Sequence, residues 1–139
     1  MRQQGAPTGS RPGGQRAAGT GPTTAQAARD GWTPVCEVDR LPSDRGVTAL
    51  VRGHAIAVFR TTDGHVYAIG NHDPASRAGT LGRGIVGTRG DIPFVASTTT
   101  RRSFDLRNGR CLDDATVSVP AYAVRVVDGV VQVGRRLTP

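Results

Sequence analysis

The stretch Val66–Leu112 reads VYAIGNHDPASRAGTLGRGIVGTRGDIPFVASTTTRRSFDLRNGRCL and carries most of the information about the fold. It begins with a short apolar strand signal and continues through a loop rich in Gly, Ser and Arg, from Gly70 to about Asp91, before a second apolar run at Ile92–Ala96. Loops of about twenty residues are uncommon inside compact domains and are usually functional or disordered. Because strand signals bound this loop on both sides, we interpret it as a functional loop held on a β scaffold.

This layout resembles the Rieske domain, in which one loop supplies Cys-x-His and a second loop supplies Cys-x-x-His shortly before a Phe-Asp hairpin. The hairpin text here is Phe104–Gly109. When the chain is matched on that hairpin and on the strand end Ala68–Asn71, the four ligand positions fall on Asp73, Ala75, Ser97 and Thr100. A Rieske cluster needs two thiolates on one iron and two imidazoles on the other. The resemblance therefore implies a Rieske-like fold in which the cluster is absent.

The amino-acid sequences of the loops restrict the resemblance to one group of Rieske-like proteins. The segments Asn71–Pro74, Leu81–Gly87 and Val95–Ser97, together with the missing ligands, look like the small subunits of cytoplasmic NAD(P)H-dependent nitrite reductases. The likeness covers roughly Trp32 to Gly134. It implies a non-catalytic small subunit, with no cofactor of its own, that docks on and supports a large subunit. That large subunit is expected to carry FAD, sirohaem, iron–sulfur and the NAD(P)H site, and to reduce nitrite to ammonium in nitrate assimilation.

The vestigial cluster loops are the docking surface that this resemblance implies, because in clustered relatives they meet the electron-transfer partner. The same use here predicts an interface made of Asn71, His72, Asp73, Arg77, Arg83, Thr99, Thr100, Arg101 and Arg102. Asp73, followed by Pro74, is expected to cap nearby backbone N–H groups and to organise its loop in place of a cluster. His72 is out of register with the ligand pattern, so we interpret it as a structural or interface residue.

The rest of the chain reads as short strands joined by tight turns. Three of the turns carry Asx-Gly pairs, at Asp63-Gly64, Asn108-Gly109 and Asp128-Gly129, and a fourth is expected at Gly53-His54. Such pairs supply the positive φ that two-residue hairpins require. Strand signals flank these turns at Val47–Arg52, Ala55–Arg60, Ser103–Arg107, Arg110–Leu112, Tyr122–Val127 and Val130–Val133. We predict an all-β fold of the Rieske-like type, an antiparallel β-sandwich or partly open barrel with two long loops at one tip.

A single domain is expected for a chain of 139 residues. Residues 1–30 contain almost no large apolar side chain, so we expect a disordered basic extension there. The Rieske-like β domain is expected over residues 31–134, and residues 135–139 form a C-terminal tail. No apolar run has the length of a signal peptide or of a membrane span, so we expect a cytoplasmic protein with no membrane partner.

The net charge of +7 comes from Arg alone, since the sequence contains no Lys. Strong basicity is typical of nucleic-acid-binding proteins, and a basic β-barrel that binds nucleic acid is one alternative. Against it, the arginines are scattered and aromatic residues for base stacking are scarce. A true Rieske-type [2Fe-2S] ferredoxin is the other alternative, and the missing ligands argue against it. We therefore favour a protein partner and expect no nucleic acid.

Catalytic and metal-binding patterns are weak in this chain. Cys36 and Cys111 form no Cys-x-x-Cys arrangement, and we interpret both as small apolar core residues. Ser97 and Ser103 have no neighbouring His in the sequence, and the pair Asp113-Asp114 is interpreted as a solvated turn. The expected catalytic residues and metal ligands on this chain are therefore none.

Overall fold

The computed structural model describes residues 30–43, 45–76 and 81–138. Within these ranges the chain forms nine strands and two short 3-10 turns. The strands are β1 (Thr33–Glu37), β2 (Val47–Val51), β3 (His54–Arg60), β4 (Val66–Gly70), β5 (Ile85–Arg89), β6 (Ile92–Ala96), β7 (Ser103–Asp105), β8 (Ala121–Val127) and β9 (Val130–Arg136). The 3-10 turns are η2 (Val38–Arg40) and η3 (Leu81–Arg83). Residues 1–29 of the extension expected over residues 1–30 lie outside the described residues, and so does Arg77.

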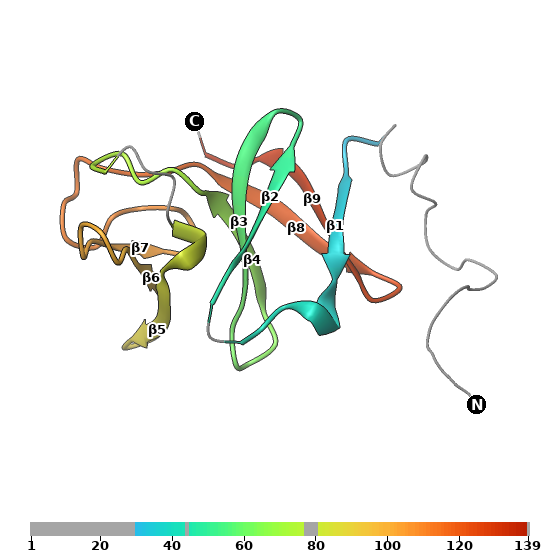
Figure 1. The fold of residues 1–139 in the computed structure, drawn as a ribbon, viewed down its shortest axis with the longest axis horizontal. Coiled ribbons are helices and arrows are strands. Elements are labelled where there is room, and N and C mark those ends of the chain that lie inside the picture. The colour runs from blue at the N-terminus through green and yellow to red at the C-terminus, as the bar shows by residue number, and fades with distance from the viewer. Residues whose placement is uncertain (1–29, 44, 77–80, 139) are drawn as a thin grey trace.

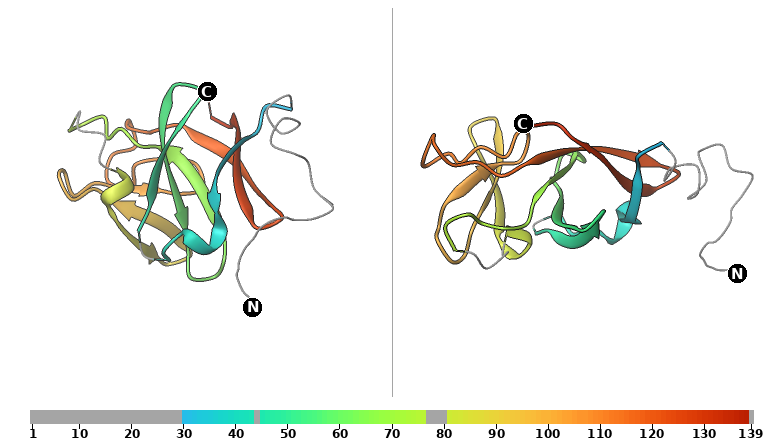
Figure 2. Two further views of the ribbon diagram at one scale, coloured as in Figure 1. Left: turned by 45° about the vertical axis from the view of Figure 1, so that its right-hand side comes forward. Right: turned by 90° about the horizontal axis from the view of Figure 1, so that it is seen from above.

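Two antiparallel sheets build the domain (Figure 1). Six strands pair in the order β1-β9-β8-β4-β3-β2, and three pair in the order β5-β6-β7. Figure 2 shows the smaller sheet at one end of the molecule, with the larger sheet curling beside it. All the strand pairs are antiparallel. The predicted all-β fold is therefore confirmed. No helix among these residues is long and apolar enough to cross a membrane.

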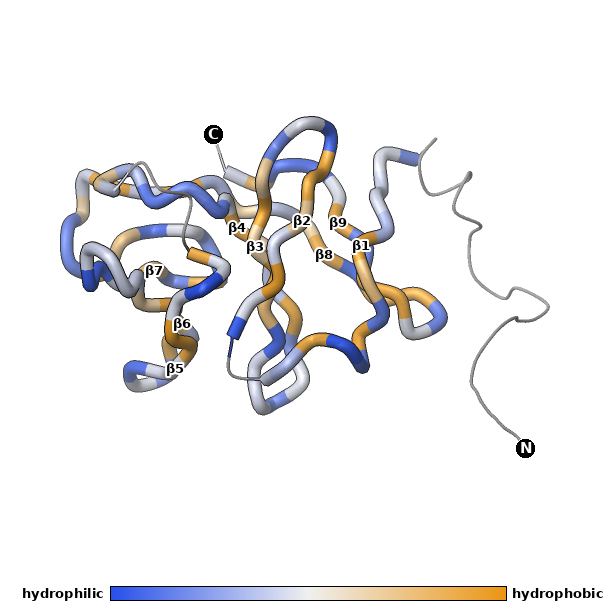
Figure 3. The backbone as a smooth tube through the Cα atoms, in the orientation of Figure 1, coloured by the Kyte–Doolittle hydropathy of each residue, from blue (hydrophilic) through white to orange (hydrophobic). Residues whose placement is uncertain are grey.

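Alternate residues of β3 supply two separate hydrophobic cores. Ala57 and Phe59 pack into one core with residues of the smaller sheet, including Val95 and Phe104. The intervening residues of β3 pack into a second core on the other face, together with residues of β2 and β9. A strand that is buried on both faces has a continuous run of apolar residues, which explains the sequence AIAVF in β3. Figure 3 shows the apolar residues gathered along the strands and the hydrophilic residues at the turns.

The expected tight turns are confirmed only in part, because Asp63-Gly64 and Asn108-Gly109 have positive φ at the glycine alone. At Asp128-Gly129 both residues have positive φ, as predicted. The turn between β2 and β3 is Arg52-Gly53 rather than Gly53-His54, because Arg52 and Gly53 have φ of 49° and 84°. The Arg52 guanidinium donates to the carbonyl oxygens of Gly31 at 2.8 Å and Gly134 at 2.9 Å. These bonds offset the cost of a left-handed Arg.

The long loop expected from Gly70 to Asp91 is shorter than predicted, because η3 and β5 lie within it. β5 pairs with β6 across Gly90, which has a φ of 64°. Ile85, at the start of this edge strand, is 65% exposed. The predicted strand Arg110–Leu112 forms only isolated bridges, and β9 continues past its expected end at Val133.

Candidate functional site

Two loops leave the ends of β4 and β6 and meet beside the smaller sheet. We call them together the loop tip and define it as Asn71–Ser76 and Ser97–Arg102. The Thr100 hydroxyl donates to Asp73 Oδ2 at 2.6 Å, which joins the two loops directly. Asp73, Ala75, Ser97 and Thr100, which the resemblance matches to cluster-ligand positions, therefore lie on two loops that are in contact.

Asp73 is the centre of the first loop, and its side chain is fully buried. Its Oδ1 accepts the backbone N–H of Ala75 at 2.9 Å, which is the capping role expected for this carboxylate. Burial acts to raise the pKa of Asp73. The hydrogen bonds from Thr100, from the backbone of Ala75 and from Ser97, together with the charge of Arg102, outweigh burial and hold this pKa below its usual range. Asp73 is therefore a paired anion at neutral pH.

Ser97 organises the second loop. Its Oγ accepts the backbone N–H groups of Thr99 and Thr100, each at 3.2 Å. Its backbone N–H donates to the Arg102 carbonyl at 2.8 Å, and its own carbonyl accepts from Arg101 at 2.9 Å. This closed turn presents the Thr100 hydroxyl to Asp73.

The residues at the four vestigial positions do not fit a [2Fe-2S] cluster. They offer one carboxylate, two hydroxyls and a methyl group, whereas the cluster requires thiolates and imidazoles. Hydrogen bonds within each loop and between the two loops already engage the carboxylate and both hydroxyls. In the part of the chain that the structure describes, no group of three or more His, Cys, Asp or Glu residues could hold a metal ion. The site is therefore a hydrogen-bonded joint between two loops.

Asn71 fastens η3 onto the first loop. Its Oδ1 accepts the Gly82 N–H at 2.7 Å and its carbonyl accepts the Leu81 N–H at 3.0 Å. Thr48 of β2 also donates its hydroxyl to Asn71 Oδ1, at 3.4 Å. A Cβ on Gly82 would lie 2.9 Å from that same oxygen, so this close approach requires glycine. The segment Leu81–Gly84 is therefore folded back against the first loop.

A third segment, Asp113-Asp114, also supports the loop tip. Asp113 Oδ2 accepts the Ser103 N–H at 2.7 Å, and Asp114 lies 3.6 Å from the Arg102 guanidinium. The pair was interpreted as a solvated turn, and Asp113 is exposed, but both residues also contact the base of the second loop. Only its position just after the Asn108-Gly109 hairpin, which returns the chain toward β7, hinted at this contact.

The predicted interface residues divide by exposure. Asn71 and Asp73 are buried, so they shape the loop tip from inside. Thr100 and Arg102 are half-buried, and Arg77 lies outside the described residues. The side chains that face solvent are His72, Arg83, Thr99 and Arg101. Arg101 has a φ of 65°, a conformation that a residue other than Gly adopts only where its surroundings enforce it.

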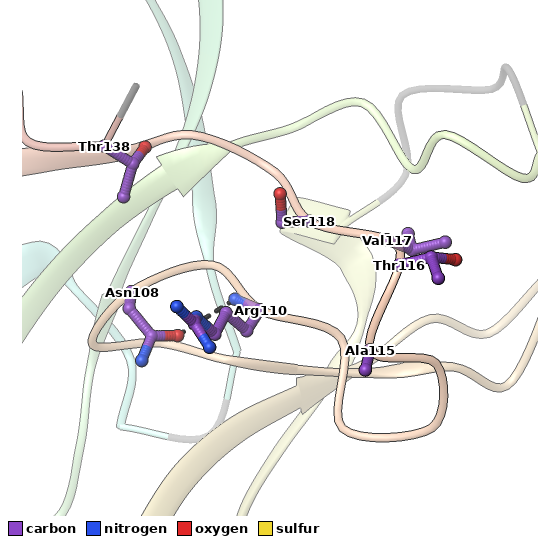
Figure 4. Close-up of a pocket in the computed structure, with 7 residues that line it drawn as sticks. All are labelled: Asn108, Arg110, Ala115, Thr116, Val117, Ser118 and Thr138. Carbon is purple, nitrogen blue, oxygen red and sulfur yellow. Dashed lines mark hydrogen bonds between the residues drawn. The ribbon is translucent and has the colours of Figure 1, made fainter.

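A surface pocket of about 510 Å³ lies apart from the predicted site residues (Figure 4). Arg110, Asn108, Thr138 and the segment Ala115–Ser118 line it. In Figure 4 the Asn108 side chain lies beside Arg110, whose backbone N–H it accepts at 3.0 Å. None of the predicted interface residues or matched cluster-ligand positions lines this pocket.

Comparison with known proteins places these features in a family. The family model described as Rieske-like [2Fe-2S] domain matches residues 31–134. The nitrite reductase (NADH) small subunit of Salmonella typhimurium is 38% identical over 102 residues, which are 73% of this chain and 94% of that relative. A crystal structure of a putative NADH-dependent nitrite reductase small subunit from Mycobacterium tuberculosis superposes with a TM-score of 0.72 at 47% identity, over 75% of this chain and 94% of the other.

A further relative has a different architecture. The nitrite reductase [NAD(P)H] large subunit of Klebsiella oxytoca is 37% identical over 105 residues, which are 76% of this chain. This chain spans only 11% of that relative. A domain of this kind therefore occurs there within a much longer polypeptide.

Proposed function

Because this chain belongs to the Rieske-like family of nitrite reductase small subunits, we propose that it is the non-catalytic small subunit of an NAD(P)H-dependent nitrite reductase. It docks on a large subunit and supports it. The observation that carries this proposal is the match to 94% of the Salmonella typhimurium small subunit at 38% identity.

The large subunit is the partner that this proposal requires. The Klebsiella oxytoca large subunit contains a segment related to this chain, so the two kinds of domain are covalently joined in that protein. A covalent link raises the effective concentration of a domain for its neighbour. In this proposal the same two kinds of domain meet through a noncovalent interface. FAD, sirohaem, iron–sulfur and the NAD(P)H site belong to the large subunit in this proposal, and the complex acts in the cytoplasm.

The loop tip is the docking surface in this proposal. Its exposed members include His72, Thr99 and Arg101, and the exposed Arg83 lies on η3, which is fastened to the first loop. The net charge of +7 favours an acidic patch on the partner, because complementary charge speeds association and fixes orientation. The hydrogen-bonded joint between Asp73 and Thr100 supports this role by holding the two loops rigid before binding, which lowers the entropy cost of association.

Binding to the purified large subunit tests the proposal. We expect the two chains to form a complex by size-exclusion chromatography with light scattering, and calorimetry to give a dissociation constant. Arg101→Ala should weaken binding by roughly tenfold, because rim charges are worth up to about 1 kcal/mol and interface arginines more. Arg135→Ala is the matched control, since Arg135 is an exposed arginine on β9 outside the loop tip. A large subunit that forms no complex with this chain would refute the proposal.

A further inference from the structure

The four outer strands of the two sheets, β1, β2, β5 and β7, differ in the features that block pairing with a further strand. Exposed strand edges present free N–H and C=O groups, and proteins usually block them with Pro, charge, bulges or short length. β1 has Pro34 and an irregular register at that residue, and β7 is three residues long. β5 contains Gly87 and ends at Arg89. β2 (VTALV) has no Pro, Gly or charge, and its pairing with β3 is unbroken.

The register identifies which backbone groups of β2 point outward. Val51 pairs with His54 across the two-residue turn, so this pair is hydrogen-bonded, and bonded pairs then alternate along the ladder. Thr48 and Leu50 therefore direct their N–H and C=O groups away from β3. Ala55, which lies opposite Leu50, is consistent with this alternation. Its carbonyl points away from β2 and accepts the Asn71 N–H at 3.0 Å, on the side of β3 that faces β4. Outside the strand ladders, no backbone hydrogen bond between described residues involves Thr48 or Leu50.

The side chains of β2 also favour an added strand. Val51 is buried, and Val47 and Ala49 pack against the second core. Leu50 is 74% exposed, the highest value among the large hydrophobic residues of the described chain. A neighbouring strand would bond to the outward groups and would also cover this side chain. The chemistry of the edge therefore fits an extended peptide.

The charge of the chain and the position of β2 indicate which polypeptide would pair with this edge. A second copy of this chain is disfavoured, because each copy carries a net charge of +7. The same net charge favours a partner that is acidic overall. The edge is continuous with the loop tip, since Thr48 donates its hydroxyl to Asn71 Oδ1. We propose that an extended segment of the large subunit, apolar where it covers Leu50, adds as a strand to the outer edge of β2; this inference depends on the proposed function.

Proline at position 50 tests the proposal with the full-length chain and the purified large subunit. Leu50→Pro removes an N–H that faces outward and leaves the ladder to β3 intact, and proline is tolerated at such edge positions. Leu50→Thr is the control, because it removes the apolar side chain and keeps the N–H. We expect Leu50→Pro to bind roughly tenfold or more weakly than Leu50→Thr, with similar circular dichroism spectra. Equal binding by two folded variants would overturn the proposal.

Hydrogen exchange of the unmodified chain gives a second measurement that does not depend on a variant folding. The amide protons of Thr48 and Leu50 should exchange quickly in the free chain and at least tenfold more slowly in the complex. Those of Ala49 and Val51 should be protected in both states. A complex that leaves Thr48 and Leu50 exchanging as before overturns this inference alone, whereas absence of any complex overturns the proposed function with it. A free chain that is dimeric and becomes monomeric on Leu50→Pro would assign the edge to a second copy, contrary to the proposal.

Discussion

Thr100 donates its hydroxyl to Asp73 Oδ2 at 2.6 Å, across 27 residues of sequence. Asp73 also caps its own loop through Ala75, and Thr100 is positioned by Ser97, so one contact joins two preformed turns. A hydrogen bond to an ionised carboxylate is roughly twice as strong as a neutral one. In this chain the hydrogen bond between Thr100 and Asp73 joins the two loops, as a bound metal cluster would do in a Rieske protein.

The first prediction concerns the strength of this joint. Asp73→Asn and Thr100→Val should each lower the free energy of unfolding by about 1–3 kcal/mol, because the first replaces an ionised acceptor by a neutral amide and the second removes a donor to a buried carboxylate. The double variant should cost less than the sum of the two. Urea denaturation of the four proteins in a double-mutant cycle measures the coupling. Strictly additive effects would show that the two residues act independently.

The second prediction concerns pH. The pKa of Asp73 is held below its ordinary value of 3.8 in the folded chain, so its ionised form stabilises the fold above that value. This contribution is lost as the pH falls below about 3.8, through the lower folded pKa. The stability difference between the unmodified chain and Asp73→Asn should stay constant between pH 7 and pH 5 and shrink toward pH 3. A difference that grows on acidification would contradict this assignment.

The third prediction concerns Gly82. Gly82→Ala should lower the free energy of unfolding by about 1–3 kcal/mol, because the new methyl group meets Asn71 Oδ1 and the Thr48 hydroxyl. Gly87→Ala is the control. Its methyl group would meet only the end of the Phe94 ring, at 3.0 Å, and that ring can turn aside. Thermal unfolding of both variants compares the costs, and Gly87→Ala should be the milder.

The fourth prediction separates stability from docking at Arg101. Arg101→Gly relieves a left-handed backbone at φ 65°, worth about 1–2 kcal/mol, against a Gly entropy cost of about 0.5–1 kcal/mol. The variant should therefore be as stable as the unmodified chain or slightly more so, while it binds the large subunit less tightly. Arg52→Gly is the contrasting case. It loses two hydrogen bonds to carbonyls and should be destabilised.

The fifth prediction concerns iron. Anaerobic reconstitution with iron and sulfide should leave the unmodified chain colourless, because its four vestigial positions supply no suitable ligand. The quadruple variant Asp73→Cys, Ala75→His, Ser97→Cys and Thr100→His should bind iron and give the visible absorption of a [2Fe-2S] centre. Stoichiometric iron and sulfide in the unmodified chain would refute our assignment of these positions.

Local signals predicted much of this molecule from its sequence. Asp128-Gly129 specified its turn through neighbouring residues alone, and Asp73 followed by Pro74 specified a capped loop. The contact between Asp73 and Thr100 depends on the packing of the two sheets, so only the family resemblance could pair them. β5 was missed because its apolar run is two residues long and is followed by Gly87. The turn at Arg52 was misplaced because its positive φ depends on carbonyl partners that are distant in sequence.

The Arg52 guanidinium has a consequence for shortening or grafting this domain. It donates to the carbonyl of Gly31, which precedes β1, and to the carbonyl of Gly134, which lies within β9. A shortened domain that keeps both contacts must therefore begin no later than Gly31, even though the first ladder contact comes at Thr33. Foreign polypeptide attached upstream of Gly31 should leave both contacts in place, whereas a chain that begins after Gly31 would keep only the contact to Gly134.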